Sequence, residues 1–226
     1  VQIAISSPEE RDWLRGYLTI PPTKHGKYPI KLYRGNPMWF GVGLLPNVQS
    51  AARDEGIIIN VTEDVGTAPP RDHRADISWL YDYQQNAVNT AVEKRNGILW
   101  LPTGAGKTEI AVAHVHSVKC EWLFLVHRAV LVSQAAERYE KRTGLKAGWV
   151  KSGVWSGRNK SERFTCATFQ GLYRHRHKPA IRDMLANIEG VIVDEAHTSA
   201  ARTYYSLLMS MTNAYYRIGL SGTPLQ

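Results

Sequence analysis

A glycine-rich loop set between an apolar run and a helical pattern constrains the fold of this chain more than any other feature. Residues 97–100 have the pattern of a strand, residues 101–108 read LPTGAGKT, and a helical pattern follows. Glycines in such a unit let the backbone curl, so that several N–H groups and the helix N-terminus face one phosphate. The sequence therefore predicts a P-loop, which the flanking strand and helix favour over a plain glycine turn.

Each side chain of this loop has an expected place around a triphosphate. The Lys107 ammonium is expected to neutralise the β and γ oxygens, and the Thr108 hydroxyl is expected to ligate Mg²⁺. Lys107 is thus a predicted catalytic residue as well as a binding residue. The other predicted phosphate-binding residues are Thr103, Gly104, Ala105 and Gly106.

A pair of acids follows a second apolar run. Residues 191–197 read VIVDEAH, which places Asp194 and Glu195 at the end of a predicted strand. Asp194 is expected to hold the Mg²⁺ shell, and Glu195 is expected to orient and deprotonate an attacking water. Two exposed acids after a buried strand also commonly begin a helix, so this motif alone leaves both interpretations open.

From residue 79 onward, strand-like apolar runs alternate with helical patterns. That alternation predicts an α/β fold in which helices cover a parallel sheet. The first helix of the region is expected to bury one apolar face. That face consists of Leu80, Tyr83, Ala87, Val88, Ala91 and Val92.

The first 62 residues predict a separate small α/β domain. Ser7-Pro8-Glu9-Glu10 has the form of a capping box with proline at the first helical position. Two further strands and a helix ending at Gly56 precede a last strand. The expected ranges are 28–34 and 39–44 for the two strands, 47–55 for the helix and 57–59 for the last strand.

A polar stretch with Gly66, Pro69 and Pro70 separates the two patterns. Glycine and proline interrupt regular structure, so we expect a linker there. The predicted domains are 1–62, the linker 63–78 and the phosphate-binding domain 79–226.

Charge and cysteine content narrow the class of protein. The 226 residues carry a formal net charge of +8 and have a pI near 9.5, which favours polyanionic partners such as nucleic acid. No apolar run approaches the roughly 18 residues needed to cross a bilayer. Cys120 and Cys166 lie in apolar stretches and predict core thiols in a reducing cytoplasm.

Basic side chains are concentrated between residues 156 and 182. The stretch contains Arg174 and offers a nucleic-acid contact, although charge runs are as often solvated faces. His175 and His177 lack nearby Cys, Asp or a third His, so we reject a zinc site.

These motifs together resemble those of superfamily 2 helicases, in particular the XPB and restriction-motor branch. The resemblance covers residues 79–224 and implies a RecA-like domain that binds ATP and Mg²⁺. Residues 80–84, LYDYQ, are similar to the adenine-binding motif, in which Tyr83 and Gln84 contact the nucleotide. Residues 219–224, GLSGTP, are similar to the coupling motif, in which Ser221 and Thr223 hydrogen-bond His197.

The resemblance also implies motifs that bind nucleic acid. Residues 127–134, HRAVLVSQ, resemble the motif that holds single-strand phosphates, and residues 166–172, CATFQGL, resemble the next one. Phe169 and Leu172 are expected to be core residues. The implied nucleic-acid contacts are His127, Arg128, Thr168, Gln170 and Arg174.

Residues 1–62 resemble the small N-terminal domain of UvsW-like phage DNA helicases, through Leu44-Leu45-Pro46, the following helix, Gly56 and a strand. The resemblance implies contact with duplex or branched DNA. The implied contact residues are Lys24, Lys27, Lys31 and Arg34.

The expected protein is an ATP-dependent DNA helicase or translocase. A second RecA-like domain is expected downstream, because such motors close ATP between two domains and take arginine fingers from the second. This stretch alone is therefore expected to hydrolyse ATP weakly. The alternatives are a truncated nucleic-acid-binding module without motor activity and the motor subunit of a restriction system.

Overall fold

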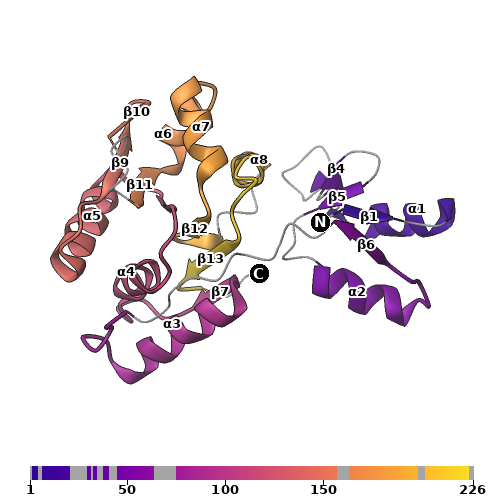
Figure 1. Ribbon diagram of the computed structural model, residues 1–226, viewed down its shortest axis with the longest axis horizontal. Coiled ribbons are helices and arrows are strands. Elements are labelled where there is room, and N and C mark those ends of the chain that lie inside the picture. The colour runs from indigo at the N-terminus through magenta and orange to yellow at the C-terminus, as the bar shows by residue number, and fades with distance from the viewer. Residues whose placement is uncertain are drawn as a thin grey trace. The chain divides into compact units, whose positions relative to one another are not determined.

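The computed structural model describes residues 2–4, 7–20, 30–31, 33–34, 38–40, 45–63, 75–156, 163–197 and 202–223 (Figure 1). The chain divides into two compact units, Val1–Pro69 and Pro70–Gln226. The division lies within the polar stretch 63–78. Each unit is described by itself.

The smaller unit combines short antiparallel strands with two helices. Its four-stranded sheet has the order β4-β5-β1-β6, and β2 pairs with β3. The strands are β1 Gln2–Ala4, β2 Thr19–Ile20, β3 Ile30–Lys31, β4 Tyr33–Arg34, β5 Met38–Phe40 and β6 Asn60–Glu63; the helices are α1 Pro8–Tyr17 and α2 Leu45–Asp54.

The capping box at the start of α1 is confirmed. The Ser7 hydroxyl accepts a hydrogen bond from the Glu10 amide at 3.1 Å, and the Glu10 carboxylate accepts one from the Ser7 amide at 3.1 Å. The helix buries Leu14 on its apolar face, and the Leu18 cap is buried as well. The sequence alone thus determined where this helix begins.

The strand predicted at residues 57–59 is wrong, because the end of α2 uses the first of these residues. Gly56 takes a left-handed φ of 69°, and its amide donates to the Arg53 carbonyl at 3.1 Å. The Ile57 amide then reaches back to the Ala52 carbonyl at 2.8 Å, which is a Schellman ending. The ladder of β6 therefore begins only at Asn60.

Other expectations for this unit are corrected in their extent. The strand predicted at 28–34 is divided into β3 and β4, and the one predicted at 39–44 is described only as β5. Lys24 and Lys27 lie outside the described residues, whereas Lys31 and Arg34 lie on β3 and β4.

The larger unit is the predicted α/β domain with a mostly parallel sheet. Its seven strands have the order β10-β9-β11-β8-β12-β13-β7, and only the β9–β10 pair is antiparallel. The strands are β7 Asn96–Trp100, β8 Trp122–Val126, β9 Gly148–Lys151, β10 Val154–Trp155, β11 Phe164–Thr168, β12 Gly190–Val193 and β13 Tyr216–Ser221.

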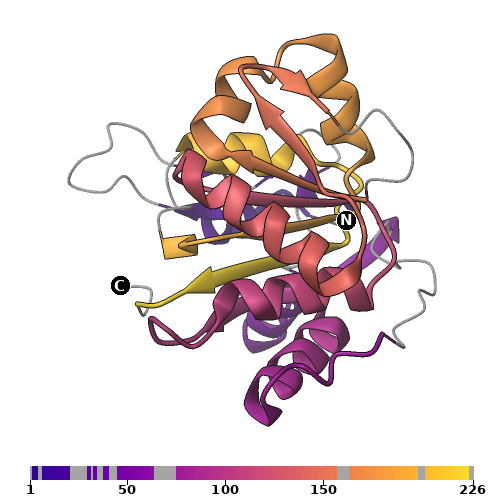
Figure 2. The ribbon, with the colours of Figure 1, turned by 90° about the vertical axis from the view of Figure 1, so that its left-hand side faces the viewer.

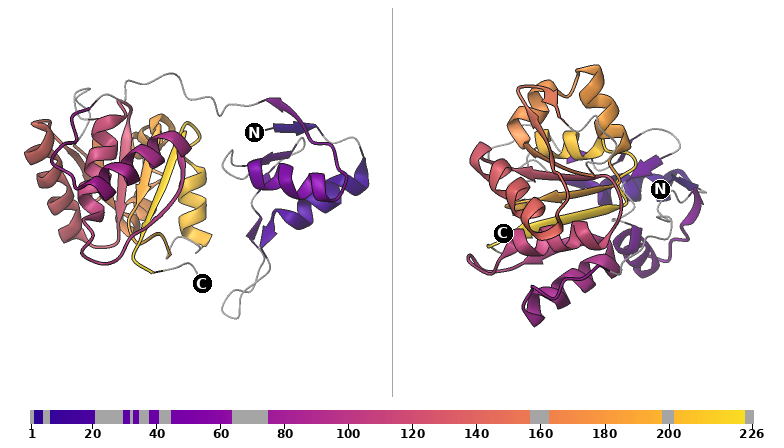
Figure 3. Two further views of the ribbon diagram at one scale, coloured as in Figure 1. Left: turned by 90° about the horizontal axis from the view of Figure 1, so that it is seen from below. Right: turned by 60° about the vertical axis from the view of Figure 1, so that its left-hand side comes forward.

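Helices cover both faces of this sheet (Figure 2 and Figure 3). Every residue of β8 and β12 is buried, as expected for parallel strands between two helical layers. Leu123, Leu125, Val191 and Val193 pack into the core under the second layer. The first layer is α3 Asp82–Lys94, α4 Lys107–Ser117 and α5 Ala129–Thr143; the second is α6 Phe169–His175, α7 Pro179–Asn187 and α8 Arg202–Met209.

In this unit a side chain packs directly against the backbone of a strand. A Cβ placed on Gly190 would lie 2.4 Å from the Trp122 ring, so the indole occupies the space of the missing side chain. Cys120 and Cys166 are both buried, which confirms the predicted core thiols. No helix in the described part of the chain is long and apolar enough to span a bilayer.

Candidate functional site

The predicted functional motifs lie together at one edge of the larger sheet. Because β7, β8, β11, β12 and β13 run parallel, their carboxyl ends meet at the same edge. Ligands of open α/β sheets bind outside these ends. The segments found there are the glycine loop after β7, His127 after β8, Phe169 after β11, Asp194 after β12 and Gly222 after β13.

The glycine loop has the backbone form that its sequence predicted. Gly104 and Gly106 have left-handed φ values of 86° and 75°, and α4 begins directly at Lys107. The N-terminus of α4 therefore points its unpaired N–H groups into the loop. The first turn of α4 contains Thr108.

Lys107 reaches toward the end of β13. Its Nζ lies 3.5 Å from the Leu101 carbonyl oxygen. A Cβ placed on Gly222 would lie 3.0 Å from that Nζ and 3.4 Å from the Thr103 hydroxyl oxygen. Glycine at 222 thus leaves room for the lysine and brings the coupling segment against the loop.

Tyr83 and Gln84 contact the same loop from α3. The Tyr83 hydroxyl donates to the Ala105 carbonyl at 3.1 Å, and the Gln84 amide nitrogen donates to it at 3.0 Å. Tyr83 is 48% exposed, so its predicted place on the buried face of α3 is wrong; Val88 and Ala91 do lie buried there. The phenol instead turns outward to bond the loop.

Asp194 and Glu195 lie at the end of β12. Burial raises the pKa of Asp194, the neighbouring Glu195 raises it further, and the positive charge of Lys107 partly offsets this rise. The acid therefore lies within the electrostatic reach of the P-loop lysine. Glu195 itself takes a left-handed φ of 52°, which is rare for a residue with a side chain.

His197 joins the acidic turn to β13. Its Nδ1 lies 3.3 Å from the Ser221 hydroxyl oxygen and 3.4 Å from a carboxylate oxygen of Glu195. Ser221 also donates to the Thr223 carbonyl at 2.7 Å, so the hydrogen bonds at Thr223 run through its backbone. The predicted hydrogen bond between Ser221 and His197 is confirmed, whereas the one predicted between Thr223 and His197 is wrong: among the described residues, Thr223 bonds Ser221 through its backbone instead.

A cavity of about 510 Å³ opens between these elements. It brings together residues with four different predicted roles, namely phosphate binding, catalysis, coupling and nucleic-acid binding. It is lined by Thr103, His127, Gln170, Glu195, His197, Tyr204, Gly222 and Thr223. No sequence signal identified Tyr204, whose ring stacks on Phe169.

The remaining nucleic-acid candidates lie outside that lining. Arg128 is the exposed N-cap of α5, and Arg174 is exposed in the last turn of α6. The Thr168 hydroxyl caps α6 by accepting from the Gly171 amide at 3.2 Å. Phe169 and Leu172 are buried, which confirms them as core residues.

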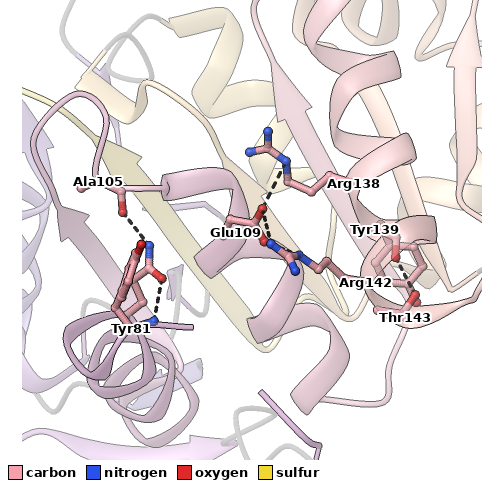
Figure 4. A network of polar contacts seen from close by, with 8 residues as sticks. Tyr81, Ala105, Glu109, Arg138, Tyr139, Arg142 and Thr143 are labelled. Carbon is pink, nitrogen blue, oxygen red and sulfur yellow. Dashed lines mark hydrogen bonds and ion pairs between the residues drawn. The ribbon is translucent and has the colours of Figure 1, made fainter. Parts of the chain in front are cut away.

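A polar network that the sequence did not predict joins α4 to α5 (Figure 4). Two nitrogens of Arg142 donate to the two carboxylate oxygens of Glu109 at 3.0 and 3.2 Å, and Arg138 lies 3.5 Å away. Glu109 is two residues beyond Lys107, so the network fixes the start of the P-loop helix. Only the spacing of Arg138 and Arg142, one helical turn apart, could have suggested it.

Fold and site together define a RecA-like P-loop domain. Residues 78–226 match the family described as Type III restriction enzyme, res subunit, and the chain belongs to this family. Residues 78–226 form the first RecA-like domain of a superfamily 2 helicase, which confirms the resemblance seen in the motifs.

Relatives and solved structures support this assignment. The chain is 30% identical over 166 residues to the DNA 3'-5' translocase XPB2 of Sulfurisphaera tokodaii, with 74% of this chain and 36% of that protein covered. It is 31% identical over 159 residues to the DNA 3'-5' helicase XPB of Kineococcus radiotolerans, with 66% and 27% covered. The chain thus spans about a third or less of these relatives.

The fold also resembles that of the UvsW helicase from bacteriophage T4. The TM-score is 0.76 at 17% sequence identity, and the match covers 98% of this chain and 89% of that one. At this identity the likeness concerns the fold.

Proposed function

We propose that this chain is the N-terminal portion of an ATP-dependent DNA helicase or translocase. ATP would bind at the loop of residues 103–108, with Lys107 on its β and γ oxygens, and Glu195 would deprotonate the attacking water. The relatives XPB2 and XPB are named as a DNA 3'-5' translocase and a DNA 3'-5' helicase, which supports DNA as the polymer.

One observation carries this proposal: the loop and the acidic pair converge. Lys107 acts on the pKa of Asp194, and Thr103 lines the same cavity as Glu195. A triphosphate held by the loop would therefore meet both carboxylates. A general base positioned in this way contributes about 10²- to 10⁴-fold to a rate.

The side chains present fit a magnesium ion. The Thr108 hydroxyl and the Asp194 carboxylate supply the hard oxygen ligands that Mg²⁺ prefers. Burial beside Glu195 disfavours the Asp194 charge, and a nearby cation would favour it. When bound, the ion supplies positive charge to the β and γ oxygens, while Glu195 remains available to take the proton.

DNA would cross the carboxyl edge next to the cavity. His127 and Gln170 line the cavity, and Arg128 and Arg174 expose their charges on α5 and α6. Contact through the cavity would let the position of the DNA strand change the position of the His197 ring. That change would then alter the contact of His197 with Ser221. The smaller unit, proposed as an accessory DNA-binding domain over residues 1–62, and a second RecA-like domain would complete the motor.

Calorimetric titration of the 226-residue chain with magnesium and the β,γ-imido analogue of ATP tests the nucleotide site. We expect Lys107→Ala to weaken binding by about tenfold or more, because it removes a charge-assisted contact. Lys94→Ala is the matched control, since Lys94 ends α3 next to the start of β7, at the opposite edge of the sheet. Equal affinity of the Lys107→Ala and wild-type chains would refute the proposed site.

A further inference from the structure

A second cavity lies beside α8, on the face of the larger sheet that carries the second helical layer. Its volume is about 260 Å³, and it is bounded by α8, β12, β13 and β7, the strand at one end of the sheet. Its apolar walls include the side chains of Ile98, Val191, Val193 and Leu208. None of these side chains belongs to the proposed nucleotide or DNA contacts, so the cavity is a separate feature of the domain.

Two glycines keep this space open. A Cβ placed on Gly97 would meet none of the described atoms within 4 Å. A Cβ placed on Gly219 would lie 2.7 Å from the Ala196 Cβ and 3.1 Å from Ile98 Cγ1, so a side chain there would take up part of the cavity. Ile98, on the edge strand, is 44% exposed. The cavity therefore opens to solvent along β7.

Arg217 brings a positive charge into this apolar lining, and among the described residues of the lining it alone is charged. Its Nε donates to the Ala214 carbonyl at 3.2 Å, Nη1 to the Leu208 carbonyl at 2.9 Å and Nη2 to the Met211 carbonyl at 2.7 Å. A guanidinium has more N–H groups than these three bonds use. The described part of the chain thus leaves donors of Arg217 available to a further acceptor.

The charge of Arg217 is only partly offset by the protein. Burial lowers the pKa of Arg217 and the Tyr205 phenol raises it, while no acid among the described residues acts on it. The carbonyls that it bonds lie at and after the end of α8, where a helix supplies a partial negative charge. A buried cation is costly unless an opposite charge lies beside it. A carboxylate in the cavity would supply that charge.

We infer that this cavity binds a small organic acid whose carboxylate accepts hydrogen bonds from Arg217 and whose branched apolar body packs against Ile98 and Val191. An apolar pocket with few polar groups is the usual form of a small-molecule site. The bound acid would contact Ala196, which lies between Glu195 and His197 in the acidic turn. The site is distinct from the proposed nucleotide site, and its occupation does not depend on nucleotide binding.

Titration of the ¹⁵N-labelled 226-residue chain with 4-methylpentanoate at neutral pH, followed by ¹H–¹⁵N correlation spectra, tests this site. We expect the amide signals of Gly97 and Gly219 to shift, with a dissociation constant of about 0.1–1 mM for a ligand with so few atoms. The neutral 4-methylpentanamide should bind about fivefold more weakly, because it loses the charge-assisted hydrogen bond. Acetate should bind about tenfold more weakly or less, because it has no apolar body to bury.

Ile98→Glu tests the cavity from the side of the protein. The new carboxylate at the open side should repel the ligand and weaken 4-methylpentanoate by about tenfold. Val154→Glu is the matched control, since Val154 is also an exposed aliphatic residue but lies on β10, the strand at the opposite end of the sheet. Both side chains are substantially exposed, so both variants should melt close to the wild-type temperature, which separates loss of binding from loss of folding.

Three results would overturn the inference. They are unshifted Gly97 and Gly219 amides, equal affinity for the acid and its amide, and equal weakening by Ile98→Glu and Val154→Glu. Lys107→Ala excludes the phosphate loop as the binding site: the acid should still bind this variant, and loss of binding would place the carboxylate at Lys107 instead. A chain that binds the acid but no nucleotide would contradict the proposed function and leave this site in place.

Discussion

The Nδ1 atom of His197 lies 3.3 Å from the hydroxyl oxygen of Ser221, and this contact joins the acidic turn after β12 to the end of β13. Ser221 is fully buried, so the hydroxyl has few alternative partners. Under the proposed function, we expect this contact to link the state of the bound nucleotide to the bound DNA.

Ser221→Ala should weaken the coupling between nucleotide and DNA while both ligands still bind. We expect unchanged nucleotide affinity but a DNA stimulation of ATP turnover lowered by about fivefold, the value of one neutral hydrogen bond. The measurement is ATP turnover with and without single-stranded DNA in the enzyme carrying both RecA-like domains. Ser210→Ala is the control, because that hydroxyl also donates to a backbone carbonyl but lies after α8. Full stimulation in Ser221→Ala would contradict the coupling role.

Glu195→Gln should separate binding from chemistry. The amide keeps the shape of the side chain but cannot accept the proton of the attacking water, so turnover should fall by about 10²- to 10⁴-fold. Nucleotide affinity should be retained. Single-turnover hydrolysis in the two-domain enzyme measures the first effect and calorimetry the second. Glu93→Gln, at the exposed end of α3, should change neither. Wild-type turnover in Glu195→Gln would exclude it as the base.

Asp194 should make stability depend on pH in a defined direction. Burial and Glu195 raise the pKa of Asp194 above its ordinary value of 3.8. The folded state therefore loses stability as the pH rises from below that value through the raised pKa. Asp194→Asn should raise the melting temperature at neutral pH in metal-free buffer, and this gain should shrink in acid. Scanning calorimetry measures both. A gain that is the same at every pH would show that charge is not its cause.

The network between α4 and α5 should contribute modestly to stability. Glu109 and Arg142 form a two-point contact but remain partly exposed, so we expect a coupling free energy of about 0.5–1 kcal/mol. A double-mutant cycle of Glu109→Gln and Arg142→Gln, measured by urea unfolding, gives this value. The control pair is Lys146 and Glu140, where one contact joins a largely exposed lysine, and there we expect almost none. Equal coupling in both pairs would contradict a special role for Glu109.

Arg128 and Arg174 should contribute to DNA binding through charge. Each replacement by alanine should make the negative slope of log affinity against log salt shallower by about 0.7, the value for one single-strand phosphate. Fluorescence anisotropy with a labelled single strand at several salt concentrations measures the slope. Lys94→Ala, at the opposite edge of the sheet, should leave it unchanged. A slope that is the same in all three variants would exclude the two arginines as phosphate contacts.

Local signals explain what the sequence could predict. The capping box at Ser7 and the glycines at 104 and 106 act within a few residues, so their patterns were sufficient. The parallel sheet followed from alternating strands and helices, and that topology explains why distant motifs meet at one edge. None of these inferences needed a tertiary contact.

Contacts between distant segments explain what the sequence could not predict. The burial of Gln84 depends on a loop 21 residues away, and the Glu109–Arg142 pair spans 33 residues. Tyr83 was assigned to the buried face by its helical spacing, yet its hydroxyl turns outward to the loop. At Ile57 apolar character predicted a strand, but its amide completes the end of a helix. At Tyr83 and Ile57, one long-range or backbone hydrogen bond overrode the local pattern.

The burial of both cysteines has a practical consequence for labelling. The pKa of the Cys166 thiol is raised by burial, so the reactive thiolate is suppressed, and Cys120 is equally inaccessible to a maleimide. The folded protein should therefore not react with thiol-reactive dyes. A single cysteine introduced on an exposed helix would accept a fluorophore at one known position, and no natural residue would have to be removed first.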